Sequence, residues 1–188
     1  RYGFATMSIN FRNGRSAESF EAFDDLACAV QFLHASKARL HIYVDRIFLV
    51  GTGAGGHLVA TAANYGFTDP PRCWPSRKRY ELSFRGAVAI SGYYNSREIS
   101  DGLEGVLFRR SLDRGRYANF FLEKDMDSSA AKPLLVVESK SRPNSVVSLK
   151  HLKTLRERMG VRTILGFIHE PAYSPNQRNI RNQILRFI

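Results

Sequence analysis

The chain has 188 residues, of which 44% are hydrophobic, a composition typical of one globular domain with a sizeable core. It holds no run of about 18 apolar residues and no signal-peptide pattern at its start, so we expect neither a transmembrane helix nor a secretory leader. A formal net charge of +11 favours polyanionic partners such as RNA, DNA or an acidic membrane surface, although solvated surface charge gives the same composition.

Basic residues and cysteines bear on partners and location. The basic residues concentrate at 77–79, at 109–116, and at Lys150, Lys153, Arg156 and Arg158. Cys28 and Cys73 do not suggest a disulfide framework, so we expect a reducing intracellular compartment, the mitochondrion in preference to the cytoplasm. No His and Cys spacing indicates a metal site, and we predict no cofactor. Because the chain starts at Arg1 rather than Met, we expect a processed product or a fragment.

Hydrophobic periodicity and turn residues predict strands that alternate with helices along the chain. The expected strands are 2–11, 47–50, 86–90, 133–137 and 161–168. The expected helices are 16–35, 58–64, one that begins at Ser145 or Ser148 and runs to 159, and 179–188. Gly160 is the expected stop of the third helix. We expect residues 96–129 to form a variable, cap-like insertion. The alternation predicts an α/β fold, a mostly parallel sheet with helices on both faces, in a single domain over residues 1–188.

Glycines crowd the turn between the second strand and the second helix, which reads Gly51-Thr52-Gly53-Ala54-Gly55-Gly56. A buried strand, a glycine turn and an apolar helix make the architecture of a nucleophile elbow, whose pattern is G-x-S-x-G. The serine of that pattern stands at the tip of a strained turn, with its hydroxyl exposed. Here the tip is Gly53, which has no side chain and therefore supplies no nucleophile.

Two other interpretations fit the same glycines. Gly51, Gly53 and Gly56 also satisfy the dinucleotide pattern G-x-G-x-x-G, with Asp69 near the expected acidic position but in a proline-rich loop. No Lys-Ser/Thr pair follows the glycines, which excludes a phosphate-binding P-loop. The simplest alternative is a turn that lets a strand and a helix pack closely, with no chemistry.

Taken together, these segments resemble the α/β-hydrolase superfamily, and within it the carboxylesterase branch that contains isoprenylcysteine methylesterases and kynurenine formamidases. The resemblance rests on Ile9-Asn10-Phe11-Arg12, the helix from Asp25 to Leu33, Val44-Asp45-Arg46-Ile47 with the glycine turn, Ser91-Gly92-Tyr93-Tyr94-Asn95, and Pro133-Leu134-Leu135-Val136-Val137. It covers nearly the whole chain and implies the fold predicted above.

The chain departs from that family where the catalytic groups would stand. The family's strand at 133–137 ends in H-G-x-x-D, but here Ser141 occupies the Asp position and Glu138 the Gly position. His169 follows the fifth strand sooner than the family's histidine does, and an ordinary loop histidine is the alternative. His57, in the elbow helix, is expected to be a packing residue.

The oxyanion-hole segment that the family carries after its third strand is not present. That strand would lie between the segment 2–11 and the elbow strand, so we expect an upstream region, another chain or a rebuilt sheet to fill the gap.

The resemblance and its departures lead to three hypotheses. The first is an inactive hydrolase-like protein that acts as a structural or interaction subunit of a larger assembly, with RNA as a possible partner through the basic surface. The second is an active carboxylic ester or amide hydrolase with a rearranged site, using Ser91 or an upstream residue with His169. The third is a small-ligand-binding module that uses the vacated pocket beneath the 96–129 insertion.

Overall fold

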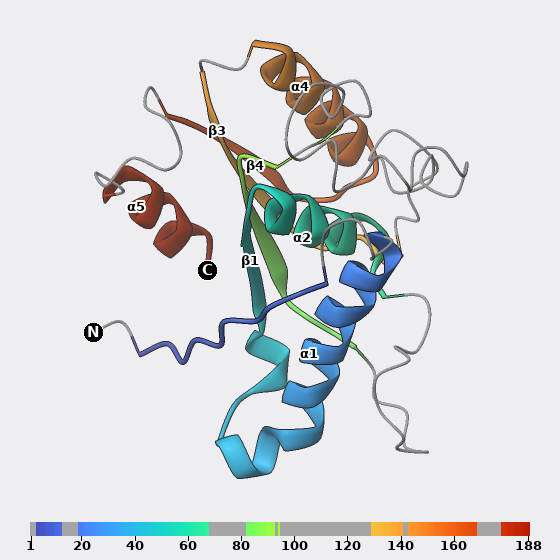
Figure 1. Cartoon of the computed structure of the whole chain (residues 1–188). Helices are drawn as coiled ribbons and strands as arrows, with labels where there is room; N and C mark the ends of the chain where they lie inside the picture. The colour runs from blue at the N-terminus through green and yellow to red at the C-terminus, as the bar shows by residue number, and fades with distance from the viewer. Residues whose placement is uncertain are drawn as a thin grey trace.

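The computed structural model describes residues 3–12, 19–67, 82–92, 94, 129–140, 143–168 and 178–188. Their elements are α1 (Ser19–Leu40), the 3-10 helix η1 (Val44–Arg46), β1 (Phe48–Thr52), α2 (Ala54–Tyr65), β2 (Gly86–Ile90), β3 (Leu134–Ser139), α4 (Pro143–Arg158), β4 (Thr163–Ile168) and α5 (Arg178–Phe187). The four described strands form one sheet in the order β1-β2-β3-β4, and each neighbouring pair is parallel (Figure 1). The predicted α/β class is confirmed.

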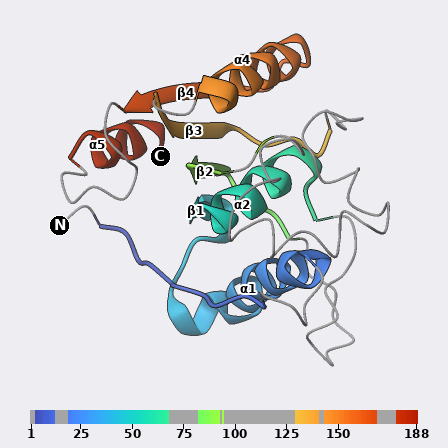
Figure 2. The same cartoon turned by 45° about the horizontal axis from the view of Figure 1, so that its top comes forward.

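Helices cover both faces of this sheet. Helices α1, α2 and α4 lie on one face and α5 lies on the other (Figure 2). The side chains of a strand point alternately to the two faces, and β2 follows this rule: Ala87 and Ala89 pack in the α2 layer, while Val88 and Ile90 pack in the α5 layer. Because both faces are covered, β2 and β3 are buried along their whole length.

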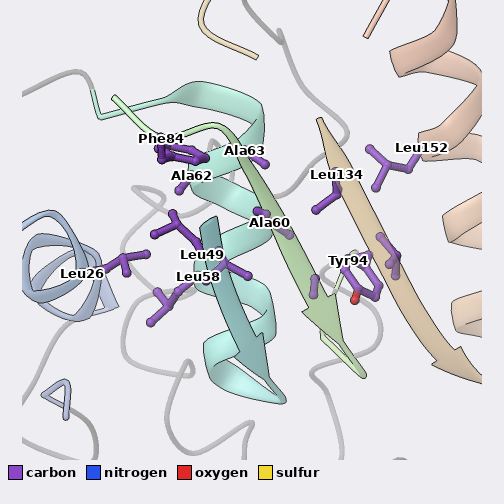
Figure 3. Packing of buried hydrophobic residues seen from close by; sticks show 14 of the residues in the cluster. Leu26, Leu49, Leu58, Ala60, Ala62, Ala63, Phe84, Tyr94, Leu134 and Leu152 are labelled. Carbon is purple, nitrogen blue, oxygen red and sulfur yellow. The ribbon is translucent and has the colours of Figure 1, made fainter. Parts of the chain in front are cut away.

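The larger core lies between α2 and the sheet (Figure 3). Three alanines of α2, Ala60, Ala62 and Ala63, are fully buried and let the helix lie close to the strands. Leu26 of α1 and Leu152 of α4 close this core on either side. The tight approach of α2 matters for function, because this helix begins at the glycine turn.

Both long helices end in the same backbone motif. Helix α1 continues to Leu40 rather than ending at residue 35, since residues 36–40 include no Gly or Pro. It ends at His41, whose φ of 52° is left-handed, with the amide of Ile42 bonded to the carbonyl of Lys37 at 3.1 Å. Helix α4 ends likewise at Gly160, with φ 73°, as the sequence predicts.

The strand predicted at 2–11 is not formed, because the described residues 3–12 have no regular secondary structure. None of the four described strands pairs with this segment. It is held instead by Arg12, whose guanidinium bonds Asp25 at 2.9 Å and Glu21 at 3.1 Å on α1. The Arg12 guanidinium is thus the anchor of the segment, and its hydrogen bonds lower the pKa of the Asp25 carboxyl against the opposing effect of burial.

Two expectations from composition are wrong. Cys28, on α1, is disulfide-bonded, although the sequence favours no disulfide; the other cysteine of the chain, Cys73, lies outside the described residues. Arg156, expected with the surface cations of α4, is fully buried. Its side chain donates to Thr163 Oγ1 at 2.8 Å, to Asn64 Oδ1 and to the carbonyl of Lys132. Arg156 therefore links α4 through buried hydrogen bonds to α2 and to the starts of β3 and β4.

Candidate functional site at the carboxyl ends of the strands

The glycine turn connects the end of β1 to the start of α2, with Gly53 between them. Gly53 has φ 58° and ψ −120°, a combination that residues with a Cβ adopt only under strain. Its amide donates to the carbonyl of Ile90 on β2 at 2.9 Å, and its carbonyl accepts the amide of His57 at 3.0 Å. The turn is therefore fixed to the neighbouring strand and to the first turn of α2, as a nucleophile elbow requires.

Two flanking glycines are required by close packing rather than by dihedral angles. A Cβ at Gly51 would overlap the carbonyl group of Gly55, and a Cβ at Gly56 would lie 2.9 Å from the carbonyl oxygen of Ile90. Gly55 differs, since its nearest neighbour would be the Phe11 ring at 4.0 Å. The spacing of Gly51 and Gly56 thus serves the sharp turn and the approach of α2 to β2.

A serine and a carboxylate meet beside the turn. Ser91 follows β2 with a left-handed φ of 48°, and its hydroxyl donates to Glu138 Oε1 at 3.3 Å. Glu138, in β3, is fully buried and also accepts the backbone amide of Ser139 at 2.8 Å. The sequence marks both residues but does not pair them. Only the sheet order pairs them, because it makes β2 and β3, at whose carboxyl ends they stand, parallel neighbours.

The described histidine nearest the turn in sequence cannot serve as a proton acceptor for this site. His57 is fully buried on α2, and its burial lowers the pKa of the imidazole to about 4. It is therefore neutral near pH 7 and lies within the α2 packing layer, in agreement with the packing role expected for it. Thr52, the other hydroxyl next to the tip, is exposed at the end of β1.

Several predicted site residues lie outside the described residues, so their positions stay predictions. These are Ser141, His169, Asp69 and all of the 96–129 insertion except Ser129. In the part of the chain that is described, no group of three or more His, Cys, Asp or Glu side chains could hold a metal ion. Likewise, no described helix is long and apolar enough to cross a membrane.

The comparison with protein families identifies the elbow's context. The family model BD-FAE matches residues 1–99, more than half of the chain, including the segment around Arg12, α1 and the glycine turn. The chain belongs to the BD-FAE family. This assignment favours the elbow interpretation of the glycine turn over the dinucleotide one. No curated protein matches the sequence.

Solved structures share the fold of this BD-FAE chain at low identity. A truncated carbohydrate esterase from gut microbiota superposes with a TM-score of 0.67 at 17% identity, covering 98% of this chain and 74% of that one. An acetyl ester-xyloside bifunctional hydrolase from Caldicellulosiruptor lactoaceticus gives 0.65 at 16%, covering 95% and 65%. A lipase/esterase from Lactobacillus plantarum gives 0.66 at 15%, covering 90% and 66%. At these identities the likenesses show a shared fold alone, and the narrower carboxylesterase branch stays a prediction.

Proposed function

We propose that this BD-FAE-family chain does not hydrolyse esters and serves as a structural or interaction subunit of a larger assembly. The observation that carries the proposal is Gly53, which occupies the elbow tip with the strained backbone dihedrals and without a side chain. An elbow presents one side chain to the substrate, so a glycine there leaves no atom to attack a carbonyl carbon. Loss of the nucleophile leaves at most a residual rate of about 10³–10⁴-fold over water.

The neighbouring groups support the same conclusion. The Ser91 hydroxyl is bonded to Glu138 and is almost entirely buried. His57 is neutral and enclosed by α2 packing. The Ser91 hydroxyl therefore donates to a carboxylate, whereas a serine nucleophile is activated by a hydrogen bond to an imidazole.

The test of inactivity is covalent labelling with a fluorophosphonate probe, together with hydrolysis of a p-nitrophenyl ester. We expect no labelling of the native protein. We also expect none of the Gly53→Ser variant, because Ser141 stands where the family's aspartate would orient a histidine. Labelling of the native protein would contradict the proposal. Labelling of the variant alone would mean that an acid and a base survive around an empty nucleophile position.

The test of the assembly role is the native mass of the protein purified gently from its source, with nucleic-acid content measured. We expect it to elute with other polypeptides or with RNA. A lone monomer that ignores RNA at moderate salt would contradict this half of the proposal and leave the inactivity untouched.

One observation favours an active esterase as the second candidate. Ser91 has a left-handed backbone, with φ 48°, and follows β2 at the sheet edge where ligands bind in open α/β folds. If Ser91 is a nucleophile, peptide mapping after fluorophosphonate treatment will find the adduct on Ser91, and Ser91→Ala will abolish it. Labelling that persists in Ser91→Ala would reject this candidate.

The disulfide at Cys28 bears on where the protein works. Disulfides persist in oxidising compartments and are rare in reducing ones, so this bond favours an oxidising compartment over the reducing one expected from the sequence. Alkylation of the native protein with and without reductant tests it directly. We expect Cys28 to be blocked until reductant is added; alkylation without reductant would restore the expectation of a reducing compartment.

A further inference from the structure

The opposite edge of the sheet, where the strands begin, is lined by basic residues. One basic residue stands within two positions of each strand's start: Arg46 before β1, Arg85 before β2, Lys132 before β3 and Arg162 before β4. Because the strands are parallel neighbours, these four residues lie along one edge of the sheet, each at or just before the start of its strand. We call this set, with the helix ends described next, the amino edge.

Three helices end at the same edge and add further cations. The last turn of α1 holds Lys37 and Arg39, that of α4 holds Arg158 and that of α5 holds Arg186. All four are exposed, as are Arg46, Arg85 and Arg162. The helix dipole favours cations at helix ends, but it does not explain the arginines that precede strands.

Two contacts bring parts of this edge together. The amide of Arg85 donates to the carbonyl of Ile47 at 2.7 Å, which brings the start of β2 to the end of η1. The Arg162 guanidinium lies 5.9 Å from the centre of the Phe187 ring at the end of α5. Figure 1 shows the end of α1 and η1 together at one end of β1, with the start of α2 at the other.

Among the described residues, few acidic side chains accompany the cations of the amino edge. None of its seven exposed cations forms an ion pair with any described residue. Asp45 is the acid within η1, and Glu157, beside Arg158, pairs with Lys153 at 3.5 Å. An exposed aromatic residue completes the surface: Tyr43 is 72% exposed, and the Arg46 guanidinium lies 5.1 Å from its ring centre.

We propose that the amino edge binds single-stranded nucleic acid. Arginine presents a planar fork of donors that matches phosphate oxygens, and six of the seven exposed cations are arginines. A track of cations beside an exposed aromatic ring is the arrangement that binds single strands with little sequence preference. A membrane surface fits less well, because the apolar face of α5, with Ile180 and Phe187, is already packed against the sheet.

This inference rests on the assembly half of the proposed function and names the surface that would contact RNA there. Its test is fluorescence anisotropy with a labelled single-stranded RNA of mixed sequence, repeated with DNA of the same sequence and across a salt series. The edge variant is Arg85→Gln with Arg162→Gln. The control is Lys150→Gln with Arg181→Gln, which removes the same charge from exposed positions on α4 and α5 away from the edge.

We expect the edge variant to bind roughly tenfold more weakly near physiological salt, and its slope of log K against log salt to be shallower by about 1.4. The control should retain the native affinity within about twofold. Thermal unfolding of both variants verifies that they are folded.

An equal loss of RNA affinity in the edge variant and the control would overturn the inference, because it would mean that binding depends on the total charge of the protein and not on the amino edge. So would the absence of saturable binding, or binding to anionic vesicles in preference to both RNA and DNA. RNA and DNA binding alike would support phosphate recognition, and a preference for RNA would support it with a contribution from the sugar. No outcome depends on hydrolysis, so failure here leaves the inactivity proposal standing.

Discussion

The two edges of the sheet differ in whether the backbone or the side chains are specialised. At the carboxyl edge, the backbone keeps the geometry of a nucleophile elbow, yet the residue at its tip has no side chain. At the amino edge, no special backbone is required, yet a basic residue precedes each described strand. In open α/β sheets the carboxyl edge is where ligands usually bind. The two proposals together imply that this fold preserves the backbone of a site without its catalytic side chain, and that its binding surface lies at the other edge.

The largest expected effect separates buried from exposed charge at the amino edge. Arg156 and Arg158 are neighbours on α4, but Arg156 is fully buried, and burial lowers its pKa to about 10. Arg156→Ala should reduce the free energy of unfolding by about 3–5 kcal/mol, because it leaves the carbonyl of Lys132 and the Asn64 side chain without their donor. Arg158→Ala should change it by less than about 0.5 kcal/mol. Urea unfolding measures both, and similar losses would mean that the Arg156 contacts contribute little.

Arg156 also marks a limit of prediction from sequence. A serine cap signal indicates where α4 begins, and Gly160 marks its end, because both signals are local. Whether a given arginine faces water or the core depends on Thr163 and Asn64, which other parts of the chain supply. The fold class, the order of elements and the elbow glycines were predictable from sequence.

The other features that the sequence did not predict also depend on residues from distant parts of the chain. The 2–11 strand has an apolar pattern but no described strand to pair with, and a strand requires a neighbour. The Ser91–Glu138 bond and the amino edge each combine residues from several strands, so only the sheet order brings them together.

The next prediction tests whether the elbow retains its strain. Gly53→Ala should lower the free energy of unfolding by about 1–3 kcal/mol, since a Cβ is unfavourable at φ 58° and ψ −120°. Gly55→Ala is the matched control, because it adds a methyl group to α2 where the nearest contact is ordinary. It should be neutral or stabilising by up to about 1 kcal/mol. If both substitutions cost the same, the positive φ at Gly53 is not what constrains this turn.

Acid should weaken the carboxyl edge through His57. The buried imidazole has a pKa near 4, well below its unfolded value, so the unfolded chain binds more protons between these values. The free energy of unfolding is therefore highest above about pH 6.5 and decreases as the pH is lowered, by about 2 kcal/mol at pH 5. His57→Asn should flatten that profile, whereas His151→Asn, at an exposed position on α4, should not. A native profile that stays level from pH 7 to 5 would mean that the imidazole is protonated without cost.

The smallest effect distinguishes stacking from charge at the amino edge. Tyr43→Ala removes the exposed ring beside Arg46 and leaves every cation in place. Stacking of a base on an aromatic side chain contributes about 1 kcal/mol at the low end, so RNA affinity should fall about fivefold. The salt slope should not change, because no phosphate contact is lost. The control is Leu40→Ala, because Leu40 is close to Tyr43 in the sequence and is 41% exposed. It should leave the RNA affinity and the salt slope unchanged. A shallower slope in Tyr43→Ala would mean that the ring acts by holding Arg46 in position, and the amino edge would then recognise phosphates alone.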